Sequence, residues 1–198
     1  MAYKINMIQL QYISQGNTPK EHLINIGEVC EAGCRWVQLR LNDVDLATYL
    51  ETAIKCREIC DQYSAIMIVR GSVSIAEASQ ADGVHLGLND INTKEARAIL
   101  GNNFIIGGTA STIQDCLKHI ENGVDYIGLE EYQNIISELK NNDINVPIIA
   151  IGEIEENDIP QIFETGVNGV AVSEMLTNHE DLEKRIRDIK KIITVTES

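Results

Sequence analysis

The sequence predicts an α/β fold, a closed (β/α)8 barrel (TIM barrel) formed as one domain by residues 1–198. Short apolar runs alternate with helical patterns along the whole 198-residue chain, in eight successive units. Most of these runs are nearly continuous in apolar residues, which is typical of parallel strands covered on both faces. No linker, low-complexity stretch or change of composition interrupts the alternation, so eight even units favour ring closure over an open sheet.

The order of strands and helices follows from the apolar runs and from residues that favour helix ends. Thr18 followed by Pro19 indicates a helix start, as does Asn92 or Thr93 ahead of Glu95. Glycines stand where helices should end, at positions 33, 101, 123 and 166. Strands are expected at Met7–Ile13, Trp36–Arg40, Ala65–Arg70, Gly83–Leu86, Phe104–Gly107, Tyr126–Leu129, Pro147–Ile151 and Gly169–Val172. Helices are expected at Pro19–Ala32, Asp45–Tyr63, Val73–Ser79, Thr93–Leu100, Ile113–Asn122, Glu130–Lys140, Glu156–Glu164 and Asp181–Ile193.

A weak internal repeat supports the even spacing of the units. A helix end, a small turn and a strand recur as EAGCRWVQL, SQADGVHLG, ENGVDYIGL and ETGVNGVAV. We align these segments at Gly33, Asp82, Gly123 and Gly166, so that one repeat step spans two βα units. The repeated strands are then the even-numbered ones of the barrel.

Charge and cysteine content limit the partners and the compartment. The net charge of −14 argues against a nucleic-acid partner and against an anionic membrane surface. No apolar run approaches the roughly 20 residues of a transmembrane helix, and the first residues do not resemble a signal peptide, so we expect a cytoplasmic protein. We expect reduced, packed thiols rather than a metal site, because no further His or Cys completes either C-x-x-x-C pair. The cysteines are Cys30, Cys34, Cys56, Cys60 and Cys116.

Polar residues at the carboxyl ends of the expected strands mark the candidate site, because barrel enzymes place their chemistry there. Gln38 and Arg40 are two residues apart and therefore share one face of their strand. A guanidinium there suits a bound anion, although a structural salt bridge across the barrel is the alternative. The segment Gly107–Thr112 could bind an anion through its amides or simply start a helix capped by Ser111 or Thr112.

The segment after the fourth strand contains two further candidates. Asp90 is a candidate metal ligand or general base, and the alternative is an acid near a helix start. His85 is a candidate ligand contact, or a core histidine with its hydrogen bonds satisfied. Gly152 and Ser173 follow the seventh and eighth strands, where barrels often bind phosphate.

Six motifs in one order resemble the thiamine-phosphate synthases and their thiazole-tautomerase relatives: WVQLRL, ADGVHLGLND, IIGGTAST, GVDYIGL, VPIIAIGEI and GVNGVAVSEML. The resemblance implies a reaction in which a hydroxymethylpyrimidine diphosphate loses diphosphate and a thiazole phosphate captures the pyrimidine cation, with Mg²⁺. By position it implies that Gln38 and Arg40 contact the diphosphate and that Asp90 is a metal ligand. Thr109 would lie near the substrate, and the thiazole phosphate would be held by Gly152 and Ser173. Arg70 and His85 complete the residues that we expect to bind substrate.

The chain departs from this family pattern at several positions. The family's Gln-x-Arg-x-Lys ends here in Asn42, and its Ile-Asn-Asp is Val69-Arg70-Gly71, which removes one metal-ligand Asp. The Thr- and Lys-containing loop after the sixth strand is absent, since the chain runs from Leu129 into helix-forming sequence. Ser111 stands where the tautomerase branch has a histidine. These losses predict weak synthase turnover, because a diphosphate requires cations around it.

Three functions are compatible with these residues. The first is a thiamine-phosphate synthase homologue that uses Mg²⁺ if it is active. The second is a non-catalytic protein that binds thiamine or a precursor of it, which an acidic barrel mouth would suit. The third is a divergent small-molecule enzyme with Glu130, Glu131 or Glu153 as base. A homo-oligomer is compatible with all three.

Overall fold

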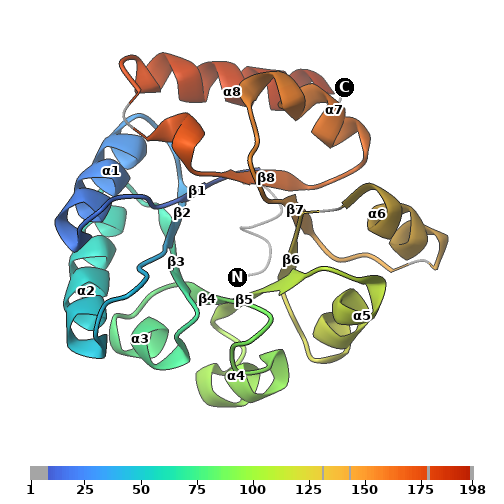
Figure 1. The fold of residues 1–198 in the computed structure, drawn as a ribbon, viewed down its shortest axis with the longest axis horizontal. Coiled ribbons are helices and arrows are strands. Elements are labelled where there is room, and N and C mark those ends of the chain that lie inside the picture. Colours follow the sequence, from blue (N-terminus) through green and yellow to red (C-terminus); the bar gives the residue numbers. More distant parts are fainter. Residues whose placement is uncertain (1–8, 131, 143, 178, 197–198) are drawn as a thin grey trace.

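The computed structural model describes residues 9–130, 132–142, 144–177 and 179–196. Its eight strands form a closed parallel barrel in chain order, with β1 (Leu10–Ile13) paired to both β2 (Trp36–Leu39) and β8 (Gly169–Val172). The helices surround this ring on its outer face (Figure 1). The predicted (β/α)8 barrel is therefore confirmed.

The remaining elements alternate around the ring as expected. The other strands are β3 (Ile66–Arg70), β4 (Gly83–Leu86), β5 (Ile105–Ala110), β6 (Tyr126–Leu129) and β7 (Ile148–Ala150). The helices are α1 (Pro19–Glu31), α2 (Leu46–Gln62), α3 (Val73–Ala78), α4 (Thr93–Leu100), α5 (Ile113–Glu121), α6 (Tyr132–Asn141), α7 (Ile159–Glu164) and α8 (Leu182–Thr196), with short 3-10 turns η2 (Glu156–Asp158) and η3 (Glu174–Leu176).

Most predicted boundaries differ from the observed ones by a few residues, and one difference matters. We expected the fifth strand to end at Gly107, but β5 continues to Ala110. The expectation was wrong because we took the glycine and threonine residues after Gly107 as a loop. In the structure, β4 pairs with this stretch as far as Gly108 and β6 pairs with it as far as Ala110. The first two residues of the predicted first strand, Met7 and Ile8, lie outside the described residues.

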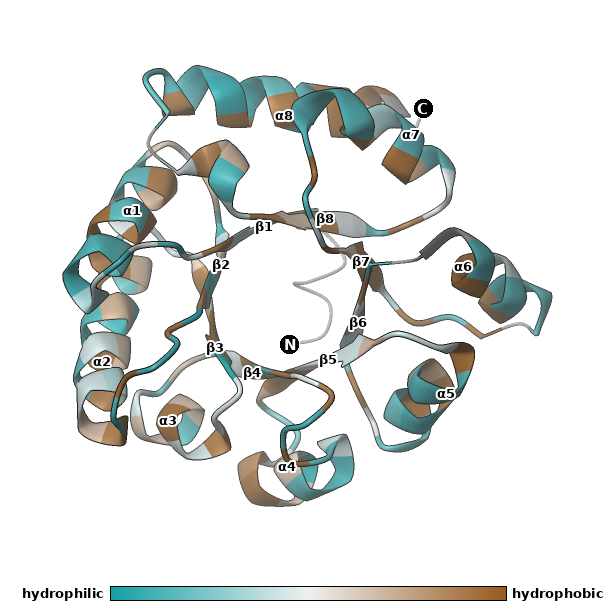
Figure 2. Ribbon diagram, in the orientation of Figure 1, coloured by the Kyte–Doolittle hydropathy of each residue, from teal (hydrophilic) through white to brown (hydrophobic). Residues whose placement is uncertain are grey.

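The core has two parts. The larger part lies between the barrel wall and the surrounding helices. Hydrophobic and hydrophilic residues alternate along these helices (Figure 2). The smaller part fills the inside of the barrel, where the Trp36 and Tyr126 rings meet edge to face with centroids 5.1 Å apart. Inside a closed barrel, such side chains form a packed floor rather than a pore. This inner core comprises Trp36, Ile66, Ile68, Ile105, Tyr126, Ile149 and Ala171.

The internal repeat has a structural cause. A polar residue stands immediately before each of β4, β6 and β8, and its side-chain oxygen accepts a hydrogen bond from a backbone amide of the preceding strand. The bond ties the start of an even strand to the start of the odd strand before it, so one tie recurs every two βα units. The pairs are Asp82 with Met67, Asp125 with Ile106, and Asn168 with Ile148, at 2.8 Å each.

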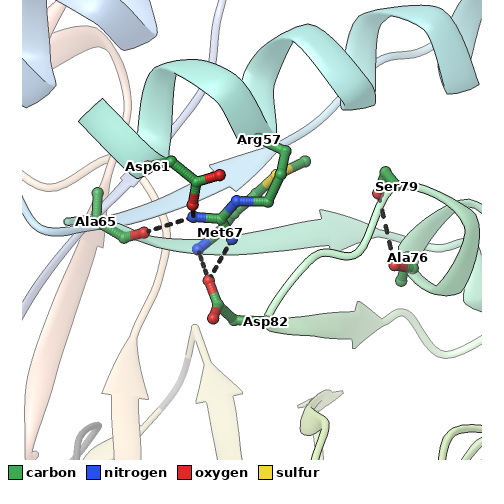
Figure 3. Close-up of polar contacts among 7 residues, drawn as sticks. All are labelled: Arg57, Asp61, Ala65, Met67, Ala76, Ser79 and Asp82. Atoms are coloured by element: carbon green, nitrogen blue, oxygen red, sulfur yellow. Dashed lines mark hydrogen bonds and ion pairs between the residues drawn. The ribbon is translucent and has the colours of Figure 1, made fainter. Parts of the chain in front are cut away.

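Arginines from the helices reinforce two of these ties. Arg57 of α2 lies 2.6 Å from the Asp82 carboxylate, which also accepts from the Met67 amide (Figure 3). The same guanidinium pairs with Asp61 at 2.8 Å and donates to the Ala65 carbonyl. Arg97 of α4 lies 2.6 Å from the Asp125 carboxylate in the same way. The helices α2 and α4 are thereby fixed to the bottom of the barrel by charge-assisted bonds.

The register of the repeat needs one correction. In three of the four segments, a glycine with a left-handed backbone conformation lies three residues before the first residue of the even-numbered strand. These glycines are Gly33, Gly123 and Gly166. The residue in this place in the remaining segment is Gln80, which has a φ of 55°. Our alignment at Asp82 was therefore displaced by two residues, because the glycine expected at that turn is replaced by a glutamine.

The cysteines match the prediction of packed thiols. All five are free and buried, and Cys30 of α1 contacts Cys60 of α2. The contact with the Cys60 thiol, and after it burial, raises the pKa of Cys30. The contact with Cys30 lowers the pKa of Cys60, but the contact with Cys56 and burial outweigh it and raise that pKa. Among the described residues, no group of three metal-ligating side chains is placed to hold an ion. None of the described helices has the length and apolar character needed to cross a membrane.

Candidate functional site

A cavity of about 1140 Å³ opens at the carboxyl ends of the strands. Two predicted residues, His85 and Asp90, do not line it: His85 lies beneath its floor and Asp90 lies beside its edge. The structure therefore brings six of the eight predicted residues to one surface. They are Gln38, Arg40, Arg70, Thr109, Gly152 and Ser173.

Two guanidinium groups project from neighbouring strands on one side of this cavity. Arg40 follows β2 and Arg70 ends β3, and among the described residues no carboxylate oxygen lies within 4.0 Å of either group. The cross-barrel salt bridge that we considered is therefore not formed there. Burial, together with the nearby charge of Arg40, lowers the pKa of Arg70 from its ordinary value. A bound anion would relieve both effects.

Arg70 stands at one end of a hydrogen-bonded chain that runs into the barrel. Its Nη1 donates to the Thr109 hydroxyl at 3.4 Å, and that oxygen lies 2.9 Å from His85 Nε2. His85 Nδ1 lies 2.9 Å from the Tyr126 hydroxyl, so both ring nitrogens have partners. Burial, and after it the charges of Arg70 and His119, lower the pKa of His85 to about 3. The imidazole is therefore neutral and supports Thr109 from below.

Gln38 lines the cavity and has a buried amide oxygen without a partner among the described residues. Its Nε2 donates to Gln11 Oε1 at 3.2 Å inside the barrel, while its own Oε1 is buried and has no hydrogen-bond partner among the described residues. Buried polar atoms normally have a partner. A ligand that carries an N–H or O–H group would satisfy this oxygen.

Asp90 lies next to Arg70 rather than in a set of metal ligands. Its Oδ2 accepts from the Gly87 amide at 2.6 Å, and a Cβ at Gly71 would lie 3.4 Å from the same oxygen. A Cβ at Gly87 would lie 2.9 Å from Arg70 Nη2, so a larger residue there would displace the guanidinium from its observed position. One carboxylate beside a guanidinium does not fit Mg²⁺, which requires several oxygen ligands and is repelled by a fixed cation.

The opposite side of the cavity is acidic, and sequence reasoning found only part of it. Glu130 and Glu153, which we named as candidate bases, line the cavity together with Glu174. Glu131 lies outside the described residues. We missed Glu155, Glu156 and Arg185, where Glu156 and Arg185 form an ion pair at 3.3 Å. Their signal is weak, because Arg185 belongs to the last helix and reaches the mouth only through the fold.

The turn after β5 does not present free amides to an anion. The Thr112 side chain caps α5, and the Asp115 carboxylate accepts from the backbone amides of Ser111 and Thr112 at 3.2 and 3.1 Å. Of our two alternatives, the capped helix start is therefore the observed one. Similarly, Asn92 caps α4 through the Glu95 amide.

A second cavity of about 900 Å³ lies beside the mouth, between the β1–α1 and β2–α2 connections. Gln15, Arg40 and Asn42 line both cavities. In its wall the buried Ser14 hydroxyl lies 2.8 Å from His22 Nδ1 and accepts from the Arg40 amide at 3.0 Å. This pair fixes the backbone from which Arg40 projects.

Similarities to known proteins agree with the geometry. The sequence model described as thiamine monophosphate synthase matches residues 10–133 and 127–176. The chain belongs to this family. The thiamine-phosphate synthase of Flavobacterium psychrophilum is 38% identical over 201 residues, which cover 92% of this chain and 98% of the relative. That of Bacteroides thetaiotaomicron is 35% identical, with 94% and 100% covered.

A solved structure extends this likeness to the fold. The thiamine phosphate pyrophosphorylase of Pyrococcus furiosus superposes with a TM-score of 0.86 at 26% identity, and the match covers 98% of this chain and all of that one. The sequence-based assignment to the thiamine-phosphate synthase family is thus confirmed, and this chain is a thiamine-phosphate synthase-like protein.

Proposed function

We propose that this family member joins a hydroxymethylpyrimidine diphosphate to a thiazole phosphate and releases diphosphate. The observation that carries the proposal is the division of the mouth into two sides of opposite charge. Arg40 and Arg70 lie on the side of β2 and β3, whereas Glu130, Glu153 and Glu174 lie on the side of β6 to β8. The reaction separates charge in the same sense.

In the proposed step, the bond between the pyrimidine methylene carbon and the diphosphate oxygen breaks, and both electrons leave with the oxygen. The lone pair of the thiazole nitrogen then forms the new bond to the methylene carbon. No oxidant, reductant or proton carrier is consumed, so the site needs only to hold the reactants and stabilise charge.

Each side of the cavity has a role in this step. The two guanidinium groups stabilise the negative charge that accumulates on the leaving diphosphate. The carboxylates stabilise the positive charge on the methylene group and later on the thiazolium ring. Gln38 Oε1 is buried without a partner among the described residues, and the Gln38 side chain would have to turn toward the cavity to accept from the pyrimidine amino group. Gly152 and Ser173 would hold the thiazole phosphate, and no step is routed through Mg²⁺ because the residues around Asp90 do not fit it.

The test is product formation from the two substrates, followed as released diphosphate and as thiamine phosphate oxidised to a fluorescent product. We expect slow turnover that falls at least about tenfold in Arg40→Gln, because one charge-assisted contact to the leaving group is lost. Arg187→Gln is the matched control, since Arg187 lies on α8 away from the mouth and is exposed. No product from the wild-type chain would contradict the proposal.

The acidic side also favours a second candidate, a non-catalytic protein that binds thiamine through its cationic thiazolium ring. Calorimetry separates the two functions. A binding protein should lose affinity from thiamine to thiamine phosphate, because phosphate adds negative charge next to the glutamates. A synthase should gain affinity, because Gly152 and Ser173 would hold the phosphate that the product keeps from the thiazole substrate. We further propose that residues 1–198 act as one domain and can form a homo-oligomer, which light scattering would measure.

A further inference from the structure

We propose that the Arg70 guanidinium occupies the place and supplies the charge that the family resemblance assigns to a divalent metal ion, so that diphosphate binds this chain without metal. The inference rests on the proposed function, because it concerns how the same site meets the leaving group. It is carried by the arrangement of Arg70, Gly71, Gly87 and Asp90.

The first step of the argument is where Gly71 lies. A Cβ at this position would be 3.4 Å from Asp90 Oδ2 and 3.6 Å from Oδ1, which is van der Waals contact. An aspartate here would therefore lie beside Asp90, and two neighbouring carboxylates are a standard way to hold Mg²⁺ against a phosphate. Glycine removes one member of that pair, and a single carboxylate remains.

The second step is that a fixed cation lies beside the remaining carboxylate. A Cβ at Gly87 would lie 2.9 Å from Arg70 Nη2 and 3.2 Å from Asp90 Oδ2, so the guanidinium and the carboxylate both lie against the same backbone. The charge of Asp90 acts on Arg70 without a direct ion pair among the described residues. Thr109 holds Nη1 at 3.4 Å, which fixes the group at the cavity wall.

The third step is the charge balance. The family pattern at the three positions is Asn, Asp and Asp with a divalent cation, which sums to zero. Here the same positions are Arg70, Gly71 and Asp90, and these also sum to zero without any ion. The two replacements each add one positive charge, so together they equal the charge of Mg²⁺. A guanidinium also presents N–H donors to phosphate oxygens in a fixed fork.

The experiment measures binding of inorganic diphosphate by calorimetry, once in EDTA and once in MgCl₂. We expect the wild-type chain to bind in EDTA at least as tightly as with Mg²⁺, because free Mg²⁺ only neutralises the anion. Arg70→Gln should weaken binding in EDTA by at least about tenfold, as expected for a lost charge-assisted contact. Arg187→Gln again controls for charge lost elsewhere. Binding of wild-type chain only in MgCl₂, or none in either buffer, would overturn the inference.

A double variant reverses the replacement. Arg70→Asn with Gly71→Asp restores two facing carboxylates, and it should bind diphosphate only with Mg²⁺ and bind Mn²⁺ directly, seen as loss of the free Mn²⁺ signal in electron paramagnetic resonance. Gly71 has a φ of 76°, which aspartate tolerates better than most residues. A thermal scan checks folding, and the wild-type comparison does not depend on the variant. Wild-type chain that itself depletes the Mn²⁺ signal would contradict the inference.

Failure of this inference differs from failure of the proposed function. If the substrates give product but diphosphate binding requires Mg²⁺, the function stands and the inference fails. If diphosphate binds in EDTA through Arg70 but no product forms from the two substrates, the inference stands and the function fails.

Discussion

Removing the Tyr126 hydroxyl should destabilise the protein through His85, although the ring that packs the barrel remains. In Tyr126→Phe the edge contact with Trp36 is retained, because only the oxygen is lost. His85 Nδ1 then loses its 2.9 Å partner in a position where the imidazole is 2% exposed. An unsatisfied buried nitrogen costs about 1–3 kcal/mol, and for a domain of this size about 2 kcal/mol lowers the midpoint of thermal unfolding by about 4–8 °C.

Tyr12→Phe is the matched control for this variant. Tyr12 is also fully buried, and its hydroxyl lies 2.9 Å from Thr177 Oγ1. Thr177 keeps a second bond, since it donates to the Ser173 carbonyl at 3.1 Å. The control should therefore lose only about 0.5–1 kcal/mol. Urea and thermal unfolding of both variants provide the measurement, and equal losses would refute the claim that the His85 network is tightly satisfied.

Three further predictions follow from buried contacts. Asp82→Ala should lower the free energy of unfolding by about 1–3 kcal/mol, because the Met67 amide loses its acceptor. Asp82→Asn should lose less, since Asn168 makes the same kind of hydrogen bond with an amide oxygen. Urea titration would show whether the two variants differ. Gly107→Ala should destabilise by about 3 kcal/mol or more, since its Cβ would overlap the Tyr126 ring, and a midpoint within 2 °C of the wild type would contradict this. His85 is protonated near its ordinary pKa of 6.5 in the unfolded chain but only near about 3 in the folded chain. The free energy of unfolding should therefore fall as pH is lowered through this window, by up to about 1.4 kcal/mol per pH unit. His85→Gln should flatten this slope.

The barrel itself could be predicted from the sequence because its signals are local and repeated. Eight apolar runs and helix-boundary residues such as Thr18 and Asn92 specify elements without knowledge of distant contacts. The extension of β5 to Ala110 could not be predicted in this way. Glycine and threonine there are strand residues only because the neighbouring strands pair with them.

The site was predicted unevenly for a similar reason. Residues at strand ends, such as Arg40 and Arg70, could be assigned to the mouth because strand position alone places them there. Tyr126 and Arg185 were missed, since one begins a strand and reaches up inside the barrel while the other reaches the mouth from α8. The function of Gly71 also depends on a distance across the fold, because only the structure brings it next to Asp90.

The neutral state of His85 links the stability of the barrel to the charge of its mouth. His85 lies beneath Thr109, which contacts Arg70, so a proton on the imidazole would place a second cation below the guanidinium. With its pKa lowered to about 3, His85 carries no charge at neutral pH, and the described positive side of the mouth is formed by Arg40 and Arg70. Removal of the Arg70 guanidinium should raise the pKa of His85, because the charge of Arg70 helps to lower it. The chemical shifts of the His85 ring, followed by NMR as a function of pH in the wild type and in Arg70→Gln, would detect this shift. An unchanged titration would show that the charge of Arg70 does not act on the interior network.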